Sequence, residues 1–175
     1  GHEESYDIII SSLPLPQSQD IFQSTIEHDS KFGPCIAVGM NFKLPSDIIH
    51  NAFKNFNADV PWFASSKFYN SEEQETWIMQ FSPEASTKMM SASDSYIENA
   101  VTRSIADFFN QDFKLKNIKI FRWKYALCSR SELNNKFTSI SEEAFAIGDW
   151  NISARVESAY ISGVALGNFL NEARA

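Results

Sequence analysis

The segment AFAIGDWNISARVESAYISG, residues 144–163, carries the pattern that decides the fold. It begins with a short apolar run, 144–147, that predicts a buried strand, and it continues through Gly148-Asp149 into residues with the spacing of a helix, from about 154 to 172. Glycine permits a close approach of the backbone to a neighbouring group. A strand that leads through a glycine into a helix presents free backbone N–H groups and the positive end of the helix dipole, where an anion such as a phosphate can bind.

Two interpretations of this segment are open on the residues alone. In the first, Asp149 accepts hydrogen bonds from the hydroxyl groups of a ligand. In the second, Gly148 and Asp149 are turn or capping residues of an ordinary connection. Small residues recur every four positions on the predicted helix, at Ala159, Gly163 and Gly167. They predict that another backbone or a flat ligand packs closely against that face, in one stripe with Val156, Tyr160, Val164 and Leu170.

The start of the chain predicts a second strand of the parallel type. Residues 6–13, YDIIISSL, form a continuous apolar run, which is typical of a strand buried on both faces of a parallel sheet. Pro14 and Pro16 end this strand, because proline cannot donate to a strand ladder. No neighbouring segment supplies a parallel partner, so the partner is expected far along the sequence or outside this chain.

The middle of the chain predicts strands at 35–42, 59–65, 75–81 and 117–127, because apolar side chains alternate along them. Pro83 can begin a short helix, and Ser95 with Glu98 matches the S-x-x-E capping box of a longer one. The alternation assigns the following residues to one face of each strand: Ile36, Val38, Met40 and Phe42; Trp77, Met79 and Phe81; Ile118, Ile120, Arg122, Lys124 and Ala126.

The composition restricts the class of protein. The chain has 175 residues, of which 43% are hydrophobic and 15 are Phe, so it can bury a real core. A net charge of −7 without a basic stripe argues against nucleic-acid binding, and no apolar run reaches the roughly 18 residues of a membrane span. Cys35 and Cys128 are isolated, as buried thiols of a cytoplasmic protein are, and the isolated His28 and His50 predict no metal site. The six glycines form neither GxGxxG nor GxxxxGK[ST], so a complete nucleotide-binding domain is not expected.

Residues 146–163 resemble the C-terminal flavin motif of amine-oxidase-type flavoproteins, and most of all the renalase-like branch of NAD/FAD-dependent oxidoreductases. Further segments agree in order: YDIIISSLPLPQ at 6–17, Trp62 with Ser65-Ser66-Lys67, the stretch 77–84, and FRWKYA at 121–126. The resemblance covers essentially residues 6–170. That family binds the ADP half of FAD with an N-terminal Rossmann unit bearing GxGxxG. This chain lacks that unit, and the resemblance therefore implies the C-terminal portion of a longer flavoprotein.

The resemblance also implies site residues. Val156 would contribute a backbone N–H to the cofactor, and Trp123 would line the flavin or substrate cavity, although a core aromatic residue explains Trp123 equally well. No residue has the features of a general base, so none is named as catalytic. The residues that would contact FAD or lie near it are Gly148, Asp149, Arg155, Val156, Glu157 and Pro14.

The expected fold is α+β: a mixed, largely antiparallel substrate-domain sheet with helices on one side, plus a strand and a C-terminal helix of an incomplete FAD-binding domain. The expected parts are a flavin-domain strand and crossover at 3–26, a substrate-binding domain at 27–120, and a return to the flavin domain at 121–175.

The implied activity is hydride transfer from a reduced substrate, a dihydronicotinamide or an amine, to flavin, with oxygen as final acceptor and with NAD(P) as a further cofactor to consider. The isolated chain would be inactive, and its partners would be a small-molecule substrate and the missing N-terminal Rossmann region. Two alternatives stay open. One is an autonomous α+β ligand-binding domain, and the other is an interaction domain that forms a homodimer through a face left uncovered.

Overall fold

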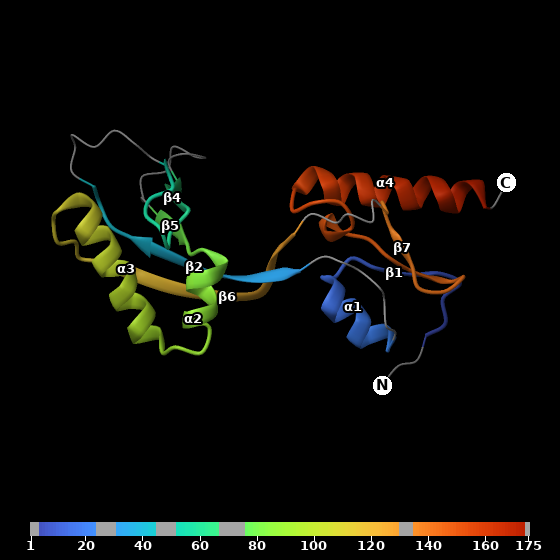
Figure 1. Ribbon diagram of the computed structural model, residues 1–175, viewed down its shortest axis with the longest axis horizontal. Coiled ribbons are helices and arrows are strands. Elements are labelled where there is room, and N and C mark those ends of the chain that lie inside the picture. The colour runs from blue at the N-terminus through green and yellow to red at the C-terminus, as the bar shows by residue number, and fades with distance from the viewer. Residues whose placement is uncertain (1–3, 24–30, 45–51, 67–75, 130–134, 174–175) are drawn as a thin grey trace. The chain divides into compact units, whose positions relative to one another are not determined.

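A computed structural model describes residues 4–23, 31–44, 52–66, 76–129 and 135–173 (Figure 1). The chain divides into two compact units. The central unit is Gly33–Ala126, and the terminal unit combines Gly1–Phe32 with Leu127–Ala175. Each unit contains both helices and strands, which confirms the predicted α+β class.

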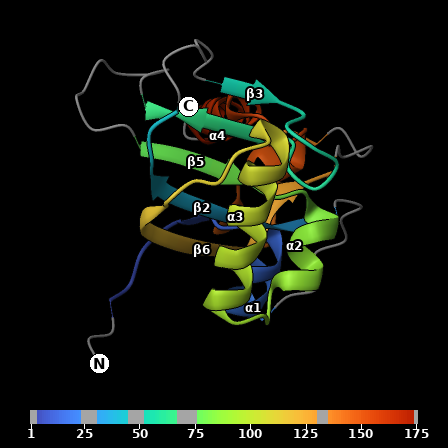
Figure 2. The ribbon, with the colours of Figure 1, turned by 90° about the vertical axis from the view of Figure 1, so that its left-hand side faces the viewer.

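The central unit is built on a five-stranded sheet with the order β3-β4-β5-β2-β6. Neighbouring strands pair antiparallel from β3 to β4, from β4 to β5 and from β5 to β2. The helix α3 crosses the strands on one face of this sheet (Figure 2). The elements are β2 (Phe32–Asn41), β3 (Ala52–Lys54), β4 (Trp62–Ser65), β5 (Thr76–Gln80), α2 (Pro83–Met89), α3 (Asp94–Phe109) and β6 (Lys116–Cys128).

The face of the sheet that packs against the helices is apolar because alternate residues of each strand point to it. Val38 lies opposite Met79, and Met40 lies opposite Trp77, and all four side chains are fully buried. The rings of Phe63 and Trp77 stack with their centroids 4.6 Å apart. The predicted faces of the strands at 35–42 and 75–81 are thereby confirmed. The helices complete this core with Ala85, Met89, Ile97, Val101 and Ile105.

The beginning of α3 differs from the prediction. Ser93, not Ser95, is the N-cap residue: its backbone is extended, and its hydroxyl accepts a hydrogen bond of 3.3 Å from the N–H of Tyr96. Glu98 therefore lies too far into the helix to complete a capping box. The capping box predicted from Ser95 and Glu98 was wrong because Ser93, two residues earlier, provides the capping hydroxyl. The helix therefore begins about half a turn earlier than predicted.

We expect Ser93→Ala to lower the free energy of unfolding by about 1 kcal/mol, because the Tyr96 N–H loses its capping acceptor. Ser95→Ala is the matched control and changes stability by only a few tenths of that amount. Urea unfolding curves of the two variants measure the difference. An equal loss in both variants would show that Ser93 is not the cap.

The terminal unit has a three-stranded sheet with the order β1-β8-β7. The strand β1 pairs parallel with β8, with Ile9 opposite Ala144. The expected parallel partner of the first strand therefore lies far along the same chain. The elements are β1 (Ile9–Ser11), α1 (Leu15–Phe22), β7 (Thr138–Ser139), β8 (Ala144–Ala146), the 3-10 helix η2 (Asp149–Asn151) and α4 (Val156–Glu172).

One burial prediction in the terminal unit was wrong. Ile9 and Ile10 are half-exposed, so β1 is not buried on both faces in this chain. The buried residues of α4 are Ser158, Ser162 and Leu166, on a face other than the predicted stripe. In the predicted stripe Val156, Tyr160 and Val164 are exposed, and an added Cβ at Gly167 would meet no atom within 4 Å. That another backbone or a flat ligand packs against this stripe stays a prediction. Within the residues that the structure describes, no helix is both long and apolar enough to cross a membrane.

Candidate functional site

Gly148 follows β8 directly, and its role is set by a contact within the chain. Its N–H donates a hydrogen bond of 3.1 Å to the hydroxyl of Ser162 in α4. Its backbone is extended, so the left-handed conformation plays no part here. A Cβ at this position would lie 2.4 Å from Nε1 of Trp150, which is closer than non-bonded atoms approach. Glycine is therefore required because the Trp150 indole occupies the space of a side chain.

The Trp150 indole connects this turn to the beginning of the chain. The side chain is buried, and its Nε1–H donates a hydrogen bond of 3.3 Å to the carbonyl oxygen of Leu13. The indole packs in a small core with Leu15, Cys128 and Ala146. Leu13 immediately precedes Pro14, the N-cap residue of α1. The predicted residues Pro14 and Gly148 thus belong to one local arrangement.

Asp149 begins η2 and interacts with a buried thiol. Burial of the Cys128 thiol, followed by the negative charge of Asp149 and the hydrogen bond to its carboxylate, raises the pKa of Cys128 to about 11. The carbonyl oxygen of Asp149 accepts backbone hydrogen bonds from Ile152, at 2.9 Å, and Ser153, at 2.8 Å. Asp149 is half-buried, and both its backbone and its side chain help to close the turn.

The beginning of α4 presents unpaired backbone donors. Arg155 is the N-cap residue, with an extended backbone and no side-chain capping bond, and Val156 is 85% exposed. The third amide of the helix, at Ser158, donates to the Arg155 carbonyl oxygen at 3.0 Å. Among the described residues, none accepts a hydrogen bond from the N–H of Val156 or Glu157. These donors, together with the helix dipole, can stabilise an anion or a polarised carbonyl oxygen.

The structure gathers the predicted cofactor residues in the terminal unit and places Trp123 in the central unit. Five of the residues lie on the continuous path from the end of β8 to the first turn of α4, and Pro14 joins them through Leu13 and Trp150. Trp123 is 57% exposed, so its alternative interpretation as a core residue is wrong.

Trp123 lines a groove of about 820 Å³ in the central unit, on the face of the sheet opposite the helix-packed core. The floor is low because the β2 residues whose side chains line the groove on this face, Ala37, Gly39 and Asn41, are small or of medium size. Larger side chains rise on either side. The described residues that line the groove are Ala37, Gly39, Met40, Asn41, Thr76, Ile78, Gln80, Asn117, Ile118, Lys119, Phe121 and Trp123.

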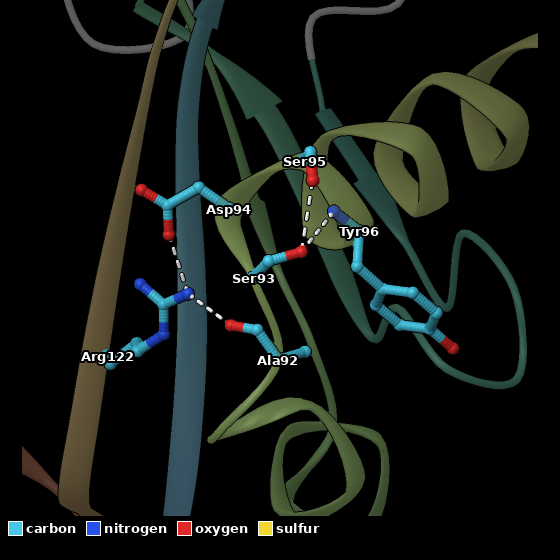
Figure 3. A network of polar contacts seen from close by, with 6 residues as sticks. All are labelled: Ala92, Ser93, Asp94, Ser95, Tyr96 and Arg122. Carbon is cyan, nitrogen blue, oxygen red and sulfur yellow. Dashed lines mark hydrogen bonds and ion pairs between the residues drawn. The ribbon is translucent and has the colours of Figure 1, made fainter.

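Arg122 of β6 is held at the beginning of α3 by two polar contacts (Figure 3). Its guanidinium Nη2 donates to the carbonyl oxygen of Ala92 at 2.9 Å and to Oδ1 of Asp94 at 2.7 Å, at the beginning of α3. Side chains alternate along a strand, so an Arg122 held on the helix face directs Phe121 and Trp123 to the groove. The predicted face of Ile118, Ile120 and Arg122 is confirmed by these contacts and by the core packing of the two isoleucines.

Sequence reasoning missed the groove residues other than Trp123. A signal was available, since Ala37, Gly39, Ile78, Lys119 and Phe121 are the positions that alternate with the predicted core positions on the same strands. Their types did not reveal a site, because small, polar and aromatic residues at such positions are equally typical of a solvated face. Only the strand order brings them together.

Comparisons with known proteins support the fold. No protein-family model matches the sequence, and no curated protein does so either. Among solved structures, the chain is similar to a "Putative protoporphyrinogen oxidase from Exiguobacterium sp. 255-15", with a TM-score of 0.63 and 12% sequence identity. The chain shares this protein's fold. The likeness covers 92% of this chain and 41% of that protein's chain, so this chain spans less than half of the neighbour's length.

We expect Gly148→Ala to destabilise the terminal unit by about 1–3 kcal/mol, because the new Cβ collides with the buried Trp150 indole. Gly167→Ala is the matched control: its Cβ enters open space within a helix, where alanine is favoured over glycine by about 0.5–1 kcal/mol. Hydrogen exchange of the α4 amides in increasing urea measures both effects. A Gly148→Ala protein with unchanged protection would contradict the assigned contact.

We expect the Cys128 thiol to react slowly with iodoacetamide at pH 8 and Asp149→Asn to accelerate the reaction several-fold, because removal of the carboxylate lowers the pKa of Cys128. Cys35 is an internal control, since burial raises its pKa without Asp149. Mass spectrometry resolves the alkylation rate of each thiol. The stabilising effect of the raised pKa is complete below the ordinary thiol value of 9.0 and is lost as the pH rises through about 11. Equal acceleration at both cysteines would point to general unfolding instead.

Proposed function

We propose that this chain is the C-terminal, substrate-domain part of an FAD-dependent oxidoreductase of the renalase or amine oxidase type. The observation that carries the proposal is the fold shared, over 92% of the chain, with the solved structure titled "Putative protoporphyrinogen oxidase". The sequence resemblance at residues 146–163 agrees with it and concerns the same end of the chain. The substrate of the complete enzyme would be a dihydronicotinamide or an amine, and NAD(P) would take part only in the first case.

The residues at the beginning of α4 fit the cofactor. The N–H groups of Val156 and Glu157 have no acceptor among the described residues, and both residues are exposed. These amides would hold a polar edge of FAD, and Arg155 would add a positive charge beside it. When bound, the flavin supplies the acceptor for hydride from the substrate. Gly148 and Asp149 would support the cofactor site from within the turn, since both already have partners in the chain.

An N-terminal dinucleotide-binding region of the same protein is the partner that the terminal unit requires under this proposal. Exposed apolar side chains lie on β1 at Ile9 and Ile10 and on α4 at Val156, Tyr160 and Val164. A three-residue strand in a three-stranded sheet buries little apolar surface by itself. Additional parallel strands on β1 and a covering segment on α4 would bury these side chains. The isolated chain is accordingly expected to bind FAD weakly and to be inactive.

A second candidate function is that of an autonomous ligand-binding domain. The groove of about 820 Å³ in the central unit favours it, because that volume suits a small organic molecule and its lining needs no second chain. The two functions differ in one measurable respect. Only the oxidoreductase proposal requires that the chain bind flavin once it is extended by the residues that precede it in its gene.

The test compares FAD binding by the 175-residue chain with binding by this extended protein. We expect the extended protein to purify with the yellow colour of bound flavin and the short chain to be colourless. A folded extended protein that binds no FAD, even when FAD is added, would contradict the proposal and favour the autonomous domain.

Within the extended protein, we expect Val156→Pro to weaken FAD binding about fivefold to tenfold, the cost of one hydrogen bond to a polarised acceptor. Proline removes the N–H but is tolerated at the first helical position, and the extended backbone of Arg155 suits a residue that precedes proline. Val156→Ala keeps the N–H and is the control, with affinity close to that of the wild type. Fluorescence titration of FAD measures both, and an equal loss in both variants would assign the effect to the side chain.

A further inference from the structure

The groove of the central unit has the shape of a trough that runs along β2. On the groove face, the register places Ala37 opposite Gln80 and Gly39 opposite Ile78. The central strand therefore presents small side chains while its neighbour β5 presents large ones. On the other side, β6 presents Phe121, which is 48% exposed, and Trp123. Large apolar side chains flank a floor of Ala37 and Gly39, and a flat ligand fits such a trough.

The charges along the trough are unequal. Lys119 is the single charged residue among the described residues of the lining, which includes no carboxylate. Lys119 is exposed, and within the described part of the chain it takes part in no ion pair. The other polar groups are the amides of Asn41, Gln80 and Asn117 and the hydroxyl of Thr76, which accepts a hydrogen bond of 3.0 Å from Asn41. A bound anion would gain a counter-charge from Lys119, whereas the described lining residues offer no carboxylate to a bound ammonium group.

The spacing along β6 places the charge and the rings within reach of one ligand. Alternate residues of a strand are about 6.6 Å apart, so Lys119 lies about 7 Å from Phe121 and about 13 Å from Trp123 along the strand. The long, flexible lysine side chain shortens these distances. One or two fused rings lying on Phe121 and Trp123 can therefore carry a carboxylate or phosphate group that meets Lys119.

We infer that this groove binds a planar aromatic or heteroaromatic molecule that bears an anionic group, and that it selects against cationic amines. An opposing effect exists, because an ammonium group is attracted to the face of an exposed indole by an amount similar to an exposed ion pair. Lys119 decides between the two, since it repels the cation and attracts the anion. As a statement about substrate the inference rests on the proposed function, and it favours a dihydronicotinamide over an amine. As a statement about binding it needs no flavin.

The test uses the 175-residue chain and three probes of similar size. These are 2-naphthoate, 2-naphthylmethylammonium and the non-aromatic cyclohexanecarboxylate, each added to low-millimolar concentration. The readout is the NMR shift of the Trp123 indole N–H, which is assigned with Trp123→Phe. Trp77 and Trp150 are buried and give an internal reference. We expect 2-naphthoate to bind about threefold to fivefold more tightly than the ammonium probe, the size of an exposed charge contact, and cyclohexanecarboxylate to bind more weakly than 2-naphthoate.

Two variants locate the binding. Lys119→Gln should lower the affinity for 2-naphthoate about threefold to fivefold and abolish or reverse the preference over the ammonium probe, whereas Lys116→Gln, at the beginning of the same strand, should change neither. Gly39→Val should fill the trough and reduce binding of every probe. A Cβ at Gly39 meets only the Lys119 carbonyl oxygen, at 4.0 Å, and valine suits a strand, so this variant should remain folded.

Three outcomes would overturn the inference. The first is equal or tighter binding of the ammonium probe by the wild-type chain, and the second is an unchanged Trp123 indole signal at the highest concentration at which 2-naphthoate dissolves. The third is an identical effect of the two lysine variants on 2-naphthoate affinity. Without any probe, broadening of the Trp123 indole signal as the protein concentration rises would show that a second copy of the chain covers the groove. That result would also overturn the inference. Because the experiment contains no flavin, its failure leaves the FAD proposal standing. Absence of flavin binding in the extended protein would in turn leave the groove's ligand preference intact.

Discussion

The parallel pairing of β1 with β8 is the interaction on which the terminal unit depends. It joins residues near the two ends of the chain, and the loss of chain entropy on closing so long a loop must be offset by few contacts. The buried cluster that offsets it is small: Leu15, Cys128, Ala146 and Trp150. Trp150 is therefore central, because its indole fills this core and its N–H binds Leu13 beside β1. Position 148 must be glycine because a Cβ there would collide with the Trp150 indole.

The sheet of the central unit has a large apolar core on one face and an open groove on the other. Alternation along β2 and β5 accomplishes this, because each buried residue is followed by one that faces the groove. Arg122 applies the same rule to β6. Its hydrogen bonds to Ala92 and Asp94 hold one face of the strand to the helices, and thereby hold Phe121 and Trp123 on the other. A polar anchor on the core side thus orients the apolar residues of the site.

Much of this architecture was predictable from the sequence, and the exceptions have physical causes. Strong alternation gave the strands around Val38 and Trp77, and the apolar helix positions gave α3. The capping serine was misassigned because two serines compete within three residues. The face of α4 that packs within this chain was not predicted, because its buried residues include Ser158 and Ser162, which bind through hydrogen bonds and not through apolar contact. The groove was not predicted because the alternation within one segment predicts a strand but not which strands lie beside it, and the groove forms only where β5, β2 and β6 are neighbours.

The division of the chain has a consequence for the order of folding. The central unit is one continuous segment, Gly33–Ala126, and its β4–β5 and β2–β5 pairings are complete once that segment has been synthesised. The strand β1 is synthesised before the central unit and its partner β8 after it, so β1 cannot pair with β8 until the whole central unit has been made. The terminal unit therefore assembles after the central unit, and until β8 is made the β1 edge that it will cover can pair with other chains, which favours aggregation.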